Sequence, residues 1–218
     1  MNKKLISPSI LTADFSNLQA ICELINQSEA DWIHLDVMDG VFVPNISFGF
    51  PVIKAVKKHC KKPLDVHIMI IHPEKYVQRF AEAGAGILTF HYEAAEHPAE
   101  IIEQIHAAGM KAGITINPDI PVKVLEPFIE KVDMVLLMSV FAGYGGQKFI
   151  EETYQRINEL QSIIQQKNPS CLLEVDGGIN LENAPKLFAQ GVDVLVVGNT
   201  VFNSNQPLEI IHQLKTIA

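Results

Sequence analysis

The sequence contains little that suits a secreted or membrane-spanning protein. It has three cysteines, which are odd in number, scattered and free of Cys-x-x-Cys spacing: Cys22, Cys60 and Cys171. They predict neither a disulfide framework nor a thiolate metal site. No apolar run approaches the roughly 20 residues that a membrane-spanning helix needs, and the first residues lead directly into a strand-like segment rather than a signal sequence. We therefore expect a cytoplasmic protein with no membrane partner.

Positive charge is also scarce. The chain has 17 lysines and arginines against 25 aspartates and glutamates, a net charge of -8, and no basic stripe with interleaved aromatics. Because nucleic acid is normally bound by a basic face, we expect no nucleic-acid partner. An acidic protein can still bind a small anion when backbone N–H groups hold it.

The length of 218 residues predicts a single domain, residues 1–218, large enough to bury a sizeable core. Eight short apolar runs alternate with longer segments, at residues 5–10, 32–37, 64–69, 86–91, 111–116, 134–138, 172–176 and 193–198. Amphipathic helical patterns lie between them, for example at 17–28, 74–83, 99–108 and 151–166. Near-continuous apolar strands separated by helices predict a parallel sheet covered by helices.

Eight such units predict a (β/α)₈ TIM barrel, whose active site lies where the strands end. The alternative is an open, doubly wound sheet. The segment after the first run, Ser9 to Asp14, has no GxGxxG turn, which favours the barrel.

Metal-type ligands recur at three of the expected strand ends. His34 and Asp36 close the second run, His67 the third and Asp176 the seventh. Successive side chains of a strand alternate between faces, so His34 and Asp36 share one face. A mixture of imidazole and carboxylate suits a divalent metal with open positions for a substrate. Each segment alone fits an ordinary polar residue at a sheet rim, but the recurrence favours one shared site.

Two further groups lie near these ligands. Asp65 and Glu174 stand two residues before a ligand on the same strand face, and we expect them to hydrogen-bond the histidines. His91, with Glu93 following, ends the fourth run and is another candidate for such a supporting role.

Glycine-rich loops follow the sixth, seventh and eighth runs. They contain Gly143, Gly145, Gly146, Gly177, Gly178 and Gly198. Glycine lets backbone amides approach a ligand closely, and such loops commonly bind phosphate in barrels. We interpret these three loops as one phosphate site, with Lys148 as a solvated neighbour.

The sequence resembles the ribulose-phosphate 3-epimerase family along essentially its whole length. The resemblance rests on six segments, at residues 7–11, 31–40, 42–45, 64–67, 143–149 and 174–179. It implies a TIM barrel that binds one divalent metal per chain, zinc or iron(II), with manganese or cobalt as alternatives. The implied metal ligands are His34, Asp36, His67 and Asp176, and Asp36 and Asp176 are the implied acid/base pair.

The resemblance also implies a small-molecule partner, a sugar phosphate, and we expect a homo-oligomer. The substrate-lining residues that it implies are Ser9, His67, Gly143, Tyr144, Gly145, Gly146, Asp176, Gly177, Gly178, Gly198 and Asn199. The chain departs from the family at Phe141-Ala142, where Asn-Pro is usual, and at Asn199, where Ser is usual. These changes fall on the phosphate loops and leave the ligand positions intact.

The implied reaction interconverts D-ribulose 5-phosphate and D-xylulose 5-phosphate, a step of the pentose phosphate pathway. Removing the C3 proton and returning one to the opposite face needs two acid/base groups. We expect Met38, Met69 and Met138 to form an apolar cap over the intermediate, their alternative role being core packing.

Three other functions are alternatives. An epimerase of a six-carbon ketose phosphate such as allulose 6-phosphate could keep every catalytic residue. A sugar-phosphate lyase or decarboxylase on the same barrel would need a lysine in an Asp-x-Lys-x-x-Asp arrangement, and no such lysine ends a strand here. A non-enzymatic binder would not need paired aspartates.

Overall fold

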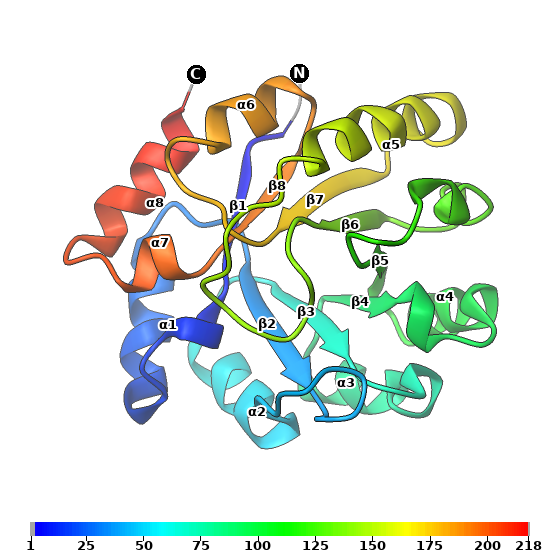
Figure 1. Ribbon diagram of the computed structural model, residues 1–218. Coiled ribbons are helices and arrows are strands. Elements are labelled where there is room, and N and C mark those ends of the chain that lie inside the picture. Colours follow the sequence, from blue (N-terminus) through cyan, green and yellow to red (C-terminus); the bar gives the residue numbers. More distant parts are fainter. Residues whose placement is uncertain (1–2, 218) are drawn as a thin grey trace.

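One parallel sheet of eight strands lies at the centre of the molecule (Figure 1) within residues 3–217, which a computed structural model describes. The strands are β1 (Leu5–Pro8), β2 (Ile33–Met38), β3 (Leu64–Met69), β4 (Ile87–His91), β5 (Lys111–Ile116), β6 (Met134–Met138), β7 (Leu172–Asp176) and β8 (Val194–Val197). Each matches a predicted apolar run to within two residues. The first run was expected to reach residue 10, but β1 ends at Pro8 because Ser9 caps a short 3₁₀ turn, Ile10–Thr12.

The sheet curls into a nearly closed barrel. Hydrogen-bonded neighbours follow the order β1-β8-β7-β6-β5-β4-β3-β2. The two ends of this order meet through one parallel bridge between Ser9 and His34, and the Asp31 amide donates to the Ile6 carbonyl at 2.9 Å. The predicted (β/α)₈ barrel is confirmed, and the open doubly wound sheet is excluded.

Helices surround the barrel (Figure 1). They are α1 (Leu18–Gln27), α2 (Phe50–His59), α3 (Val77–Ala83), α4 (Pro98–Ala107), α5 (Thr153–Lys167), α6 (Ala184–Ala189), α7 (Asn199–Phe202) and α8 (Pro207–Thr216). The described segment between β5 and β6 has only a 3₁₀ turn, Val122–Leu125. Prolines at 118, 121 and 127 each remove a backbone donor and so disfavour an α-helix there.

The two faces of the strands bury different chemistry. Leu35, Val66 and Leu88 are fully buried in the large apolar cluster that joins the strands to the helices. The alternate positions of the same three strands carry His34, Asp65 and Thr89, which are also fully buried. On these three strands the positions that face the barrel interior are therefore polar, whereas those that face the helices are apolar.

The helices are short or amphipathic. Within residues 3–217, none is both long enough and apolar enough to cross a membrane.

Candidate active site

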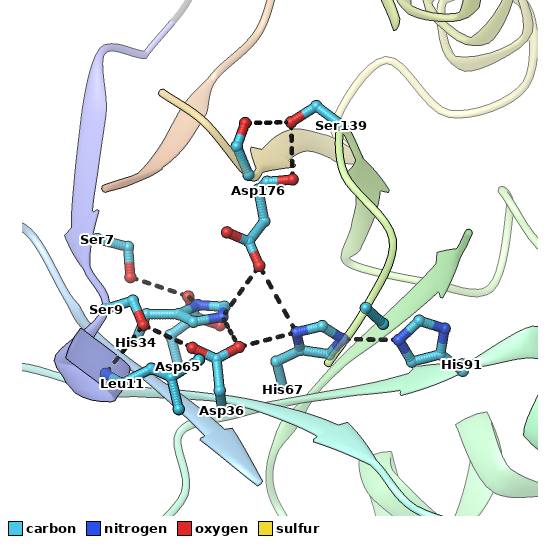
Figure 2. Close-up of polar contacts among 12 residues, drawn as sticks. Ser7, Ser9, Leu11, His34, Asp36, Asp65, His67, His91, Ser139 and Asp176 are labelled. Carbon is cyan, nitrogen blue, oxygen red and sulfur yellow. Dashed lines mark hydrogen bonds and ion pairs between the residues drawn. The ribbon is translucent and has the colours of Figure 1, made fainter. Parts of the chain in front are cut away.

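Strand register brings the predicted metal ligands together. In the ladder between β2 and β3, His34 stands opposite Asp65 and Asp36 stands opposite His67. Asp176, the last residue of β7, reaches toward the same point from the other side of the barrel (Figure 2). One ligand atom from each of His34, Asp36, His67 and Asp176 lies within 4.8 Å of the others.

The spacings within this cluster suit a shared ion better than direct hydrogen bonds. Asp36 Oδ1 lies 3.4 Å from His34 Nε2 and 3.3 Å from His67 Nδ1. Asp176 Oδ2 lies 4.0 Å from His34 Nε2 and 3.8 Å from His67 Nδ1. Ligands that each lie ~2.0–2.2 Å from one zinc ion are separated by roughly 3.0–3.5 Å, so the Asp36 contacts already fit such a centre.

The two histidines turn one nitrogen each toward this point and anchor the other. His34 Nδ1 meets Asp65 Oδ2 at 2.7 Å, and Ser7 Oγ donates to the same oxygen at 2.9 Å. His67 Nε2 meets His91 Nε2 at 2.9 Å, as Figure 2 shows. His34 Nε2 is buried with no hydrogen-bond partner among the described residues. An orphaned imidazole nitrogen that faces two carboxylates is the arrangement a metal ligand requires.

In the metal-free cluster the pKa values of the two aspartates are shifted in opposite directions. Burial raises the pKa of Asp176 to about 7, and the neighbouring Asp36 carboxylate adds to the rise. Burial acts in the same direction on Asp36, but the His34 and His67 rings outweigh it and hold its pKa below the ordinary value. Near neutral pH one carboxyl is therefore ionised while the other can carry a proton.

The pKa values of the two histidines are also shifted in opposite directions. Burial lowers the pKa of His34, but the Asp65 and Asp36 carboxylates outweigh it and raise the pKa well above its usual range. Burial lowers the pKa of His67, and lowers that of His91 to about 4. His91 is therefore neutral at pH 7 and can accept a hydrogen bond from His67.

Glu174 lies beside Asp65 and His34, with which it forms a second group of close ligand-type atoms. Burial raises its pKa well above the usual range, and the Asp65 carboxylate adds to the rise. Asp65 meets His34 as the sequence predicts. Glu174 was also expected to hydrogen-bond a histidine, but its two carboxyl oxygens are buried without a hydrogen-bond partner among the described residues.

Each aspartate is held by a serine. Ser9 Oγ donates to Asp36 Oδ2 at 2.5 Å. Ser139 Oγ lies 2.7 Å from the backbone carbonyl oxygens of Asp176 and of Gly177, and its one proton is shared between them, which fixes the main chain at the end of β7.

A cavity of about 580 Å³ opens above this cluster, a size typical of small-ligand sites. Most of the expected substrate residues line it, namely Ser9, Gly143, Tyr144, Gly145, Gly146, Asp176, Gly177, Gly178, Gly198 and Asn199. His67, also expected there, is fully buried beneath and is not among the lining residues. Lys148 is the one lysine or arginine among the described lining residues, so few cationic side chains are available to an anion there.

Four of the cavity glycines, Gly145, Gly146, Gly177 and Gly178, have no free space for a Cβ. A Cβ on Gly178 would lie 2.4 Å from the Phe149 backbone nitrogen, and one on Gly146 would lie 2.4 Å from Asn199 Nδ2, which would have to move. Gly146 and Gly178 also have positive φ, 76° and 64°. The three glycine loops are thus packed against one another around the cavity.

The three methionines lie at the cavity wall. Met38 and Met69 are partners in the β2–β3 ladder and pack with Val43. Met138 stands opposite Asp176 in the β6–β7 ladder. Ala142 packs against both apolar groups, so one small side chain joins the two halves of the apolar wall.

Comparison with known sequences decides the family. The sequence profile of the ribulose-phosphate 3 epimerase family matches residues 5–202. A Bacillus subtilis (strain 168) protein named ribulose-phosphate 3-epimerase is 43% identical over 211 residues, 96% of this chain and 97% of that protein. The chain belongs to the ribulose-phosphate 3-epimerase family. A Schizosaccharomyces pombe relative with the same name is 41% identical and aligns with 96% of this chain and 92% of that protein.

Solved structures agree on the architecture of this epimerase-family chain. A tryptophan synthase alpha-subunit from Pyrococcus furiosus superimposes with a TM-score of 0.72 at 16% identity, covering 99% of this chain and 98% of that one. At this identity the likeness supports the barrel alone.

Sequence reasoning missed several residues around this epimerase-family site. Ser7 holds Asp65, while Asn45 and Asn117 bind the loop after β6 from two sides. Ser7 stands two residues before Ser9, so a strand places both on the same face, and this spacing could have predicted that Ser7 faces the site. The two asparagines follow β2 and β5 and carried no recognisable spacing.

Proposed function

We propose that this protein is a ribulose-phosphate 3-epimerase that interconverts D-ribulose 5-phosphate and D-xylulose 5-phosphate. One observation supports this above the others. Asp36 and Asp176 come from separate strands, line the floor of one cavity and have pKa values shifted in opposite directions. Inverting a carbon by proton transfer needs such a pair, one group to accept a proton and one to supply it.

In the proposed reaction one aspartate, as carboxylate, takes the proton from C3. The C3–H electron pair forms a C2–C3 double bond, and negative charge develops on the C2 oxygen as an enediolate. The other aspartate, as carboxylic acid, then delivers a proton to the opposite face of C3. The reverse reaction exchanges the two roles, so the roles of Asp36 and Asp176 depend on which epimer is bound.

Acid/base catalysis contributes about 10²- to 10⁴-fold, below the ~10⁶-fold or more typical of enzymes. A divalent ion held by His34, Asp36, His67 and Asp176 would supply the remainder as a Lewis acid for charge on the substrate oxygens. A set of two imidazoles and two carboxylates fits zinc or iron(II) as the resident metal, with manganese and cobalt as competitors. Metal analysis of protein purified without added ions distinguishes them.

We further propose that backbone amides hold the substrate phosphate. The cavity is lined by Gly143, Tyr144, Gly145 and Gly146 of the loop after β6 and, in the neighbouring loops, by Gly177, Gly178, Gly198 and Asn199. Clustered amides can bind a dianion without lysine. Ser9, which holds Asp36 in place, lies beside Gly198 in the same cavity.

Met38, Met69 and Met138 form the apolar wall of the cavity next to the carboxylates. We assign them the role of excluding water from the enediolate, because a water molecule there would compete for its charge.

The function is tested by proton exchange followed by NMR in heavy water, with D-ribulose 5-phosphate and allulose 6-phosphate as separate substrates. The proposal predicts deuterium at C3 and the appearance of D-xylulose 5-phosphate from the pentulose. Faster turnover of the hexulose phosphate would identify a six-carbon epimerase instead. Loss of a carbon fragment or of carbon dioxide would indicate a lyase or decarboxylase.

We place the enzyme in the cytoplasm as a single-domain subunit of a homo-oligomer. Its three cysteines are buried as free thiols, which suits a reducing compartment. Val41, Ile46 and Ile71 are exposed in the loops after β2 and β3. A second copy of the chain that packed on these apolar side chains would remove them from water, which favours self-association. Light scattering across a concentration series tests the oligomer, and fractionation of the source cells tests the location.

A further inference from the structure

Two asparagine side chains grip the loop that follows β6, here called the phosphate loop (residues 141–147). Asn117 Oδ1 accepts a hydrogen bond from the Ala142 amide at 3.0 Å. Asn45 Nδ2 donates to the Gly143 carbonyl at 2.8 Å. The two bonds therefore fix backbone groups of consecutive residues, one from each side of the loop.

The asparagines come from different parts of the barrel. Asn117 directly follows β5, and Asn45 lies in the loop after β2. The phosphate loop starts at β6 and passes across the barrel opening toward β2 (Figure 1). It is thus fastened at both sides of the opening it spans.

Asn117 is itself held rigidly. Its backbone amide and its side-chain Nδ2 both donate to Glu93 Oε1, at 2.8 and 3.0 Å. Arg156 donates to the Asn117 carbonyl at 2.9 Å and to the Met138 carbonyl at 3.0 Å. Because Nδ2 is committed to Glu93, the amide orientation is fixed and Oδ1 must face Ala142.

Such fastening matters because the loop is rich in glycine. Gly143 has φ of 125° and Gly146 has φ of 76°, and glycines in a free loop sample many conformations. Amides that bind an anion must be aligned beforehand, since ordering them on binding costs affinity. Ala142 also packs on the apolar groups around Met38 and Met138, which holds its side chain in place while Asn117 holds its amide.

We propose that Asn45 and Asn117 are positioning residues for substrate binding, which clamp the phosphate loop so that its glycine amides are aligned for the phosphate group. The inference rests on the proposed function for the identity of the substrate. Neither asparagine touches the metal-type cluster, so its effect falls on binding of the phosphate rather than on the proton transfers.

The test compares Asn45→Ala and Asn117→Ala with Asn168→Ala. Asn168 is a matched control because it is half-buried and donates to the Ile129 and Val132 carbonyls, but it caps the end of α5 before β7, away from the cavity. Four quantities are measured: KM and kcat for D-ribulose 5-phosphate, the dissociation constant of inorganic phosphate by ³¹P NMR, metal content, and C3 exchange of unphosphorylated D-ribulose.

Each clamp variant should raise KM and the phosphate dissociation constant about three- to tenfold, the worth of one hydrogen bond, with kcat changed less. Metal content and exchange of D-ribulose should match wild type, and Asn168→Ala should alter thermal stability alone. Unchanged phosphate affinity in both clamp variants would overturn the inference, as would an equal loss of D-ribulose exchange.

Two further outcomes, unfolding of a clamp variant and an inactive wild-type protein, can be told apart from failure of the clamp proposal. Should Asn117→Ala unfold because it releases Glu93, Asn45→Ala decides the matter, since the Tyr144 hydroxyl bond to the Pro44 carbonyl still ties the loops together. A wild-type protein with no activity on ribulose 5-phosphate would contradict the proposed function alone, because the affinity for inorganic phosphate still reports on the clamp.

Discussion

His34 and Asp65 are partners in the ladder between β2 and β3, and their side chains meet at 2.7 Å inside the barrel. The Asp65 carboxylate accepts from His34 Nδ1, which leaves Nε2 directed at Asp36 and Asp176. A register contact thereby sets the tautomer of a metal-type ligand, as supporting carboxylates do in zinc sites.

The first prediction follows from this pair. Asp65→Asn removes the negative charge behind His34 and should weaken zinc binding roughly 10- to 100-fold, measured by competition with a chelator. The matched control is Asp133→Asn, which alters an exposed Asp–His pair at 2.8 Å, with His106. Zinc affinity should be unchanged in the control. Equal affinities in all three proteins would show that Asp65 does not support the metal ligand.

The second prediction concerns protons released on metal binding. The pKa of His34 is raised well above its usual range by the neighbouring carboxylates, although burial opposes this, and burial raises that of Asp176 to about 7. Both groups must be deprotonated to bind an ion. At pH 8 Asp176 has already lost its proton, whereas at pH 6 it still carries one. Zinc binding to metal-free protein should therefore release about one more proton at pH 6 than at pH 8.

Calorimetry in two buffers of different ionisation enthalpy measures this difference. Asp176→Asn should lose the pH-dependent part of the release. Identical release at both pH values in the wild-type protein would place the titrating proton elsewhere.

The third prediction concerns the packing of the glycine loops. Gly146→Ala would place a methyl group 2.4 Å from Asn199 Nδ2 and should raise KM for the sugar phosphate tenfold or more, roughly the cost of displacing one aligned binding group. Gly109→Ala is the control for backbone strain, since Gly109 has φ of 80° but nothing within 4 Å of the added atom. Gly109→Ala gives the loss of thermal stability that positive φ alone causes, and only Gly146→Ala should also raise KM in steady-state kinetics.

A second variant tests whether side-chain charge contributes to phosphate binding. Lys148→Ala removes the one basic side chain among the described cavity residues and should leave KM within about twofold, since backbone amides are expected to hold the anion. A large rise in KM for Lys148→Ala with none for Gly146→Ala would assign phosphate binding to the lysine.

Much of this site could be predicted from sequence because strands impose a period of two residues. Alternation alone put His34 and Asp36 on one face, and the barrel topology put Asp176 at the same mouth. The identity of the partners could not be predicted, since it depends on register. Asp65 was expected to support a histidine, and the β2–β3 ladder pairs it with His34 rather than with His67 of its own strand.

The supporting asparagines could not be predicted because their contacts join loops that are far apart in sequence. Asn45 meets Gly143 across 98 residues, and Asn117 meets Ala142 across 25. Such contacts depend on the path of the phosphate loop, which glycine leaves undetermined locally. The absence of an α-helix between β5 and β6, by contrast, could have been predicted, because the prolines of that segment are visible in the sequence.

In the proposed mechanism Asp36 and Asp176 serve opposite faces of the sugar. β7 lies three positions from β2 around the ring, through β1 and β8, so the two carboxylates approach the cluster from different sides. Asp36→Asn and Asp176→Asn should each reduce epimerisation by about 10²-fold or more, the contribution of one acid/base group. Either variant can still exchange the C3 proton of the epimer whose proton faces the remaining carboxylate.

The most direct measurement is ²H exchange at C3 by NMR on Asp176→Asn loaded with metal, with occupancy verified in the same sample. We expect exchange into one of the two epimers, D-ribulose 5-phosphate or D-xylulose 5-phosphate, without conversion to the other, and exchange into the opposite epimer for Asp36→Asn. Epimerisation by metal-replete Asp176→Asn at near the wild-type rate would contradict the two-base mechanism.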